Sequence, residues 1–207
     1  MGYRTFTDCL ADLEAHGHLR RIDAPVDPVL EAGVIQRRVF RAGGPALLFT
    51  NVTGTPFPMA ANVFGTMERM RFLFRDTLDA VERLLALKAD PTAALKAPWR
   101  YLNVPRALWN ARPKPVATGA VLQNEAALSS LPRLVSWPRD GGAYVTLPQV
   151  YTEDPANSGF RGSNLGMYRV QLDGEGYVPD AEAGLHYQIH RGIGPHHAEA
   201  LAREEPL

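Results

Sequence analysis

The side chains with the most chemical capacity gather between residues 159 and 194. They are one amide, one arginine, two glutamines and two histidines: Asn164, Arg169, Gln171, Gln188, His186 and His190. Amide oxygens and imidazoles can bind a divalent metal, and a guanidinium can bind an anion. The segment therefore predicts a site for a metal and an anion. A simpler interpretation is that these residues form the solvent-exposed polar face of an ordinary sheet.

The spacing of His186 and His190 is one that zinc proteases use. Two histidines four residues apart bind zinc when they lie on a helix and a glutamate directly follows the first. Tyr187 stands in the place of that glutamate, and the local pattern is that of a strand. The sequence therefore argues against a zinc protease.

Two strands must position these groups. Alternation predicts strands over 165–172 and 185–190, with a loose turn at 158–162 before Asn164. Successive side chains of a strand point to opposite faces, so every second residue shares a face. The predicted shared faces hold Met167, Arg169 and Gln171 on the first strand and His186, Gln188 and His190 on the second.

A glycine-rich loop at 191–195 opens a predicted final helix over 196–203. Free N–H groups at the start of a helix favour anions, so the loop is a candidate anion site. A plain turn is an equally good interpretation, because two glycines before a helix are common.

Three motifs resemble the UbiD family of decarboxylases. They are NLGMYRVQ at 164–171, HYQIHRG at 186–192, and an upstream series with LP at 131–132, SWPRDGG at 136–142 and VTLP at 145–148. Order and spacing agree with the family from residue 131 to residue 194, and the N-terminal half is similar more diffusely.

The resemblance implies a site for prenylated FMN and a divalent metal, usually manganese, with potassium as a second candidate ion. In the family, residues matching Asn164 and His190 bind the metal together with a later glutamate, and the metal holds the phosphate of the cofactor. The residue matching Arg169 is catalytic and holds the substrate carboxylate. Gly166, Met167 and Tyr168 are expected to present their backbone to the cofactor, beside Asn164, Arg169 and His190.

The resemblance also implies the activity, a reversible non-oxidative decarboxylation of an aromatic or α,β-unsaturated acid. A flavin prenyltransferase would supply the cofactor, and the complete enzyme is expected to be a homo-oligomer. The family's catalytic glutamates follow the region that matches Gly194, and Glu204 and Glu205 match no such motif. We therefore expect the front portion of a longer enzyme, inactive alone. The alternative is a non-catalytic module for flavin or metal binding or for assembly.

Helices and strands mix in the first part of the chain and strands dominate the second, which predicts an α+β fold. We expect a small α/β lobe over 1–115, ending in a connector at 97–114 that is rich in Pro, Trp and Arg, with the domain boundary near Pro115. Residues 116–207 form the second predicted domain. The resemblance implies that this domain is the first part of a flavin-reductase-like split β-barrel.

Capping residues mark the predicted helices. Thr5 or Thr7 caps the first helix, which Gly17 stops, the Asp27-Pro28 pair opens the second, and Thr66 caps another over 67–74. Further predicted strands cover 19–22, 46–52, 57–64, 116–123 and 143–151.

Composition narrows the class of protein. Lys and Arg together number 22, as do Asp and Glu, so the net charge is zero. This balance does not indicate binding to nucleic acid or to an anionic membrane surface. The single cysteine, Cys9, excludes an internal disulfide and is expected in the core. Residues 1–14 lack the apolar run of a signal peptide and no stretch is long enough to span a bilayer, so we expect a cytoplasmic protein.

Overall fold

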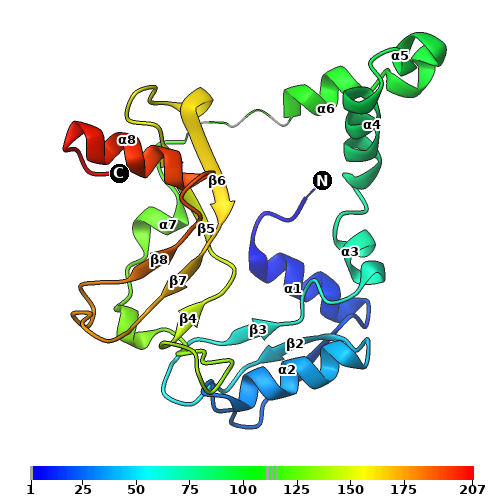
Figure 1. Cartoon of the computed structure of the whole chain (residues 1–207). Helices are drawn as coiled ribbons and strands as arrows, with labels where there is room; N and C mark the ends of the chain where they lie inside the picture. The colour runs from blue at the N-terminus through cyan, green and yellow to red at the C-terminus, as the bar shows by residue number, and fades with distance from the viewer. Residues whose placement is uncertain (1, 111, 113, 115) are drawn as a thin grey trace. The chain divides into compact units, whose positions relative to one another are not determined.

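A computed structural model describes residues 2–110, 112, 114 and 116–207, which fall into two compact units (Figure 1). Unit 1 comprises residues 1–22, 36–49 and 60–125, and unit 2 comprises 23–35, 50–59 and 126–207. Each unit is therefore assembled from separated stretches of sequence. The boundary predicted near Pro115 falls on a residue outside the described ones, so the division into 1–115 and 116–207 stays a prediction.

Unit 1 contains a small sheet surrounded by helices. Its elements are α1 (Phe6–Ala15), β1 (Leu19–Ile22), β2 (Ala46–Phe49), β3 (Met59–Ala61), α3 (Met67–Leu73), α4 (Leu78–Ala89), α5 (Ala93–Lys96), η1 (Pro98–Tyr101), α6 (Val104–Asn110) and α7 (Ala120–Gln123). The helix α2 (Glu31–Arg41) starts in a segment of unit 2 and ends in one of unit 1. The sheet has the order β1-β2-β3, and β1 pairs with β2 in parallel, Leu19 opposite Ala46.

The core of unit 1 forms where α1 and α3 meet this sheet. Its buried residues are Cys9, Leu13, Leu19, Ala46, Leu48, Val63 and Leu73. The strand predicted over 46–52 ends at Phe49 as β2, and every residue of β2 is buried, as the apolar run from Ala46 predicts. Burial raises the pKa of the Cys9 thiol, which leaves this cysteine a small apolar core residue, as expected.

The helix caps follow from local chemistry. The Thr5 side chain accepts a hydrogen bond from Asp8 N at 3.0 Å, and Asp8 accepts one in return from Thr5 N, so Thr5 rather than Thr7 caps α1. Gly17 follows α1 with a φ of +75°, a left-handed conformation that favours glycine. Thr66 caps α3 by accepting from Arg69 N.

Arg69 is buried in unit 1, 2% exposed, and is held by backbone oxygens. Its Nε donates to Val63 O at 2.9 Å and its Nη2 to Asn62 O at 2.7 Å. Its Nη1 donates to Gly44 O at 3.2 Å. Burial lowers the pKa of this guanidinium, and the three carbonyls offset the cost of desolvating it.

Unit 2 contains two small antiparallel sheets and a final helix (Figure 1). Its elements are η2 (Leu128–Ser130), β4 (Tyr144–Val145), β5 (Gln149–Glu153), η3 (Phe160–Gly162), β6 (Ser163–Met167), β7 (Arg169–Gln171), β8 (Gly184–His186) and α8 (Ile193–Arg203). One sheet has the order β4-β7-β8, and β5 pairs with β6 in the other. In the register of the first sheet, Arg169 lies opposite His186 and Gln171 lies opposite both Gly184 and Tyr144.

Several predicted strands are shorter or broken. The strand predicted over 165–172 is interrupted at Tyr168, which separates β6 from β7. The strand predicted over 185–190 ends at His186, so His190 lies in a turn and the face predicted to hold His186, Gln188 and His190 does not exist. The strands predicted over 57–64 and 143–151 likewise shrink to β3 and to the separate β4 and β5.

The Asp27-Pro28 pair does not open a helix. Leu30 N donates to Val135 O at 2.8 Å, Val135 N donates to Pro28 O, and Leu30 has a φ of +70°. This pairing with a distant segment engages the backbone of Pro28 and Leu30, and α2 starts only at Glu31.

Two further predictions about local structure were wrong. The connector predicted over 97–114 contains η1 and α6, because Pro105 stands in the first turn of α6, where a missing N–H costs nothing. The strand predicted over 116–123 is replaced from Ala120 by the helical turn α7. The mixture of helices and small sheets confirms the α+β class, while the split barrel stays a prediction. Across the described residues, no helix combines the length and apolar character that crossing a membrane requires.

Candidate functional site

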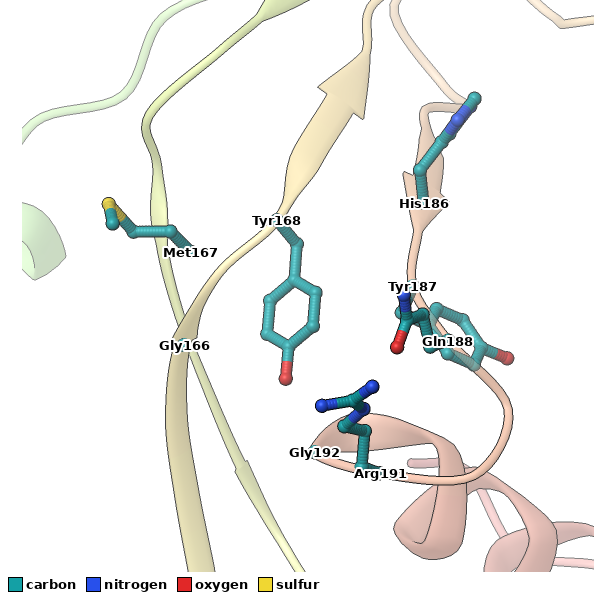
Figure 2. Close-up of a pocket in the computed structure, with 8 residues that line it drawn as sticks. All are labelled: Gly166, Met167, Tyr168, His186, Tyr187, Gln188, Arg191 and Gly192. Carbon is teal, nitrogen blue, oxygen red and sulfur yellow. The ribbon is translucent and has the colours of Figure 1, made fainter.

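A pocket of about 600 Å³ opens in unit 2 where β6, β8 and the turn before α8 come together (Figure 2). It is lined by Gly166, Met167, Tyr168, His186, Tyr187, Gln188, Arg191 and Gly192. The two motifs at 164–171 and 186–192 thus build one concave surface. Figure 2 shows the Tyr168 ring extending toward the turn of Arg191 and Gly192, while the Met167 side chain points to the other side of its strand.

Two glycines make room for Tyr168. A Cβ atom at Gly166 would lie 2.7 Å from Cε2 of the Tyr168 ring, and one at Gly192 would collide with its hydroxyl. Gly192 also has a φ of +64°, a conformation that side chains rarely adopt. Both positions therefore need glycine for this ring to reach the start of α8.

The Tyr168 hydroxyl joins three parts of the site. It accepts a hydrogen bond from Asn164 Nδ2 at 2.9 Å and another from Ile193 N at 3.2 Å. Ile193 is the first residue of α8, whose early N–H groups have no partner inside the helix. One hydroxyl oxygen therefore ties the strand residue Asn164 to the beginning of α8.

Both histidines of the first turns of α8 are held by side chains from neighbouring elements. The Tyr187 hydroxyl and His197 Nδ1 share a hydrogen bond, and their rings meet edge to face. Thr152 Oγ1 of β5 and His196 Nδ1 lie 3.0 Å apart. These contacts hold α8, the helix that follows the last lining residue of the pocket.

One face of the β4-β7-β8 sheet carries a polar network next to the pocket. The Arg169 guanidinium lies over the Tyr144 ring, 3.8 Å from its centre, and the same ring meets His186 edge to face. His186 Nε2 and Gln171 Oε1 are 2.9 Å apart, and Gln171 Nε2 donates to Gly141 O at 2.8 Å. His186 belongs to both the network and the pocket, so it links the two.

The predicted site residues divide into two groups. Gly166, Met167 and Tyr168 line the pocket, and Asn164 contacts it through the Tyr168 hydroxyl. Arg169 and His190 are not among the described residues that line it. Within the described part of the chain, no group of three or more His, Cys, Asp or Glu side chains is arranged to hold a metal. The catalytic and metal-binding roles therefore stay predictions.

Sequence reasoning missed Tyr187 as a pocket residue. Strict alternation put Tyr187 on the face opposite His186 and Gln188, yet all three line the pocket. Because β8 ends at His186, alternation does not apply to the two residues that follow. The glycine-rich loop at 191–195 was the available signal that the strand gives way to a turn here.

Comparison with known proteins identifies the family. Residues 10–88 match the model of the 3-octaprenyl-4-hydroxybenzoate carboxy-lyase N-terminal domain, and residues 110–207 match that of the Rift-related domain of the same carboxy-lyases. The chain belongs to the UbiD family. The motifs of the pocket therefore lie within the second matched domain of a UbiD protein.

Relatives of this UbiD chain are considerably longer. It is 40% identical over 205 residues to an uncharacterized protein of Chlamydia trachomatis, a match that covers 94% of the chain and 33% of that relative. It is 39% identical to a protein of Chlamydia pneumoniae that is named as one of the subunits of a 4-hydroxybenzoate decarboxylase, with 89% of the chain and 31% of the relative covered. The chain thus spans about a third of the length of these relatives.

Solved structures share the fold. The closed form of vanillic acid decarboxylase from Sedimentibacter hydroxybenzoicus superposes with a TM-score of 0.71 at 23% identity, covering all of this chain and 42% of the other. An evolved dimeric form of the UbiD-class enzyme HmfF from Pelotomaculum thermopropionicum, solved in complex with prFMN, gives a TM-score of 0.64 at 23% identity, covering 99% of this chain and 43% of that one. At this identity the likeness establishes the fold alone.

Proposed function

We propose that this UbiD chain is the front portion of a decarboxylase that uses prenylated FMN and a divalent metal, manganese, to remove carbon dioxide reversibly from an aromatic or α,β-unsaturated acid. The observation that carries the proposal is the convergence of the motifs at 164–171 and 186–192 on one pocket beside the start of α8. When bound, the modified flavin would supply the electron sink for losing carbon dioxide.

The residues of the pocket suit the phosphate end of such a cofactor. Arg191 contributes a positive charge, and the first N–H groups of α8 bring the positive end of the helix dipole to the same edge. Met167 and Tyr168 would present their backbone to the flavin.

Asn164 and His190 are the proposed metal ligands. Manganese is a hard cation that prefers oxygen and imidazole ligands, which an amide oxygen and a histidine provide. Such an ion wants about six ligands, so the phosphate and further groups must complete the set. A later glutamate of the longer relatives is the expected protein contribution, and potassium is a second candidate ion nearby.

Arg169 is proposed to hold the substrate carboxylate. Its planar guanidinium can give a carboxylate two parallel hydrogen bonds and stays charged at every physiological pH. Its place on the sheet face next to His186 keeps it close to the pocket wall.

The proposal has three further parts. A flavin prenyltransferase supplies the cofactor, the complete enzyme is a homo-oligomer, and it is located in the cytoplasm.

Completing the chain tests this function. The chain is joined to the part of the Chlamydia pneumoniae relative that follows the matched region, and assayed anaerobically with prenylated FMN, MnCl2 and a panel of aromatic acids. We expect turnover by the joined protein and none by the 207-residue chain alone. Turnover by the chain alone would disprove its dependence on further residues. Flavin binding by the joined protein without turnover of any acid would favour the non-catalytic module.

The same joined protein tests the metal ligands. His190→Ala should lose manganese and flavin together, measured by metal analysis and absorbance after purification. His18→Ala in unit 1 is the control and should keep both. Normal manganese and flavin contents in His190→Ala would show that His190 is not a ligand.

A further inference from the structure

We propose that Tyr168 is a positioning residue that sets the orientation of the Asn164 amide and so makes its oxygen available to a metal. This inference rests on the proposed function, since the amide oxygen matters only if Asn164 binds a metal. It assigns to Tyr168 a side-chain role in addition to the backbone role expected from its place in the motif.

The hydrogen bonds fix which end of the amide faces which way. Asn164 Nδ2 donates to the Tyr168 hydroxyl at 2.9 Å, so Oδ1 takes no part in that bond. Oδ1 lies instead 3.6 Å from where a Cβ atom of Gly192 would stand. The oxygen therefore faces the turn that carries His190 and Gly192, with no side chain of Gly192 in front of it.

Orientation matters because an asparagine amide has two chemically different ends. Only the oxygen can ligate a cation, whereas the NH2 group repels it. An amide without a fixed partner can rotate and present either end. A hydrogen bond to Nδ2 restrains that rotation in advance, as hydrogen bonds to metal ligands generally do.

Tyr168 can hold the amide because its own position is fixed at three points. Its hydroxyl also accepts from Ile193 N, and its ring passes close to Gly166 and Gly192. Neither hydrogen bond uses the phenolic proton. A movement of α8 would thus reach Asn164 through a single oxygen atom.

Manganese itself can test the proposal on the full 207-residue chain. MnCl2 is titrated into the isotopically labelled chain, and paramagnetic broadening of the Asn164 side-chain amide and the His190 and Gly192 backbone amides is followed by NMR. This readout detects weak sites and needs neither cofactor nor turnover. In Tyr168→Phe, we expect the manganese concentration for half broadening to rise about 10- to 100-fold, the usual effect of losing a partner of a metal ligand.

Two further variants separate orientation from general damage. Tyr151→Phe removes a hydroxyl from the other strand of the same hairpin, where it donates to Glu153, and should leave the broadening unchanged. Asn164→Asp replaces the amide with a carboxylate whose two ends are both oxygens. In that background, Tyr168→Phe should no longer change the manganese concentration that is needed.

The outcomes distinguish this inference from the proposed function. No broadening at Asn164 or His190 in the unsubstituted chain would overturn this inference, whereas the proposed metal site is judged separately by His190→Ala in the joined protein. Broadening that is equal in the unsubstituted chain and Tyr168→Phe would overturn the role of Tyr168 alone. If Tyr168→Phe does not fold, the orientation of the Asn164 amide is tested in the unsubstituted chain. We expect nuclear Overhauser effects between the Asn164 Nδ2 protons and the Tyr168 ring, and their absence would refute the orientation.

Discussion

Arg169 lies over Tyr144, with its guanidinium carbon 3.8 Å from the centre of the ring. The stacking leaves the edges of the guanidinium free to form hydrogen bonds in its plane. Nη2 of Arg169 approaches Asp140 Oδ1 at 3.8 Å, and the side chain is 48% exposed. Arg169 is therefore held on one side and open on the other, an arrangement suited to receiving an anion.

Replacing Arg169 by lysine tests the geometry rather than the charge. Lysine cannot give two parallel hydrogen bonds, and losing a charge-assisted hydrogen bond costs on the order of 1.5–3 kcal/mol, or roughly ten- to a hundredfold in rate. We expect Arg169→Lys to lower turnover of the joined protein by at least that factor while flavin stays bound. Arg161→Lys in the exposed η3 is the control. Near-normal turnover by Arg169→Lys would leave Arg169 as an ordinary arginine of a sheet face.

Arg69 should be essential for the stability of unit 1. Arg69→Leu leaves the buried oxygens of Val63 and Asn62 without their donor, which should lower the free energy of unfolding by about 2–5 kcal/mol. Urea unfolding followed by circular dichroism measures the change. Arg71→Leu, on the exposed side of the same helix, should stay within about 0.5 kcal/mol of the unsubstituted chain. Equal stability of the two variants would contradict the role of the three carbonyl contacts.

Asp12 should make unit 1 sensitive to acid. Hydrogen bonds from the Tyr3 hydroxyl at 2.6 Å and from Arg75 at 2.8 Å hold the pKa of Asp12 below its ordinary value of 3.8. A carboxylate with a lowered pKa adds stability above its unfolded-state pKa and loses it as the pH falls through the lowered value. The free energy of unfolding should therefore fall below about pH 3.8, and less steeply in Asp12→Asn. Asp79→Asn, exposed on α4, should keep the slope of the unsubstituted chain.

The beginning of α1 provides a test of local capping. Thr5→Ala removes the oxygen that accepts from Asp8 N and should cost about 1 kcal/mol of stability. Thr7→Ala lies inside the helix, where alanine is the better helix former, and should cost nothing. Thermal unfolding of the two variants distinguishes them. The opposite ranking would mean that α1 starts after Thr7.

Features set by neighbouring residues could be predicted from the sequence. The cap at Thr66, the stop at Gly17 and the buried run from Ala46 each depend on a few consecutive residues, and the structure contains all three. Capping and burial of a short apolar run need no knowledge of the rest of the chain.

Features set by distant residues could not be predicted in the same way. The Asp27-Pro28 pair has the signature of a helix start, but its backbone pairs with Val135, more than a hundred residues away. The strand break at Tyr168 accompanies a hydrogen bond to Ile193, and no pattern within 165–172 reports it. Motif resemblance indicated which residues form the site, whereas their mutual contacts depend on such long-range pairs.

The interleaving of the two units limits how this chain can be divided or recombined. The chain passes from one unit to the other after residues 22, 35, 49, 59 and 125. A single crossover between two genes at residue 125 would keep unit 1 whole but take 23–35 and 50–59 of unit 2 from the other parent. A crossover at residue 22 would keep unit 2 whole but split unit 1, and one between these two points would split both units. Neither unit can therefore be exchanged as a cassette, and the two should be inherited together.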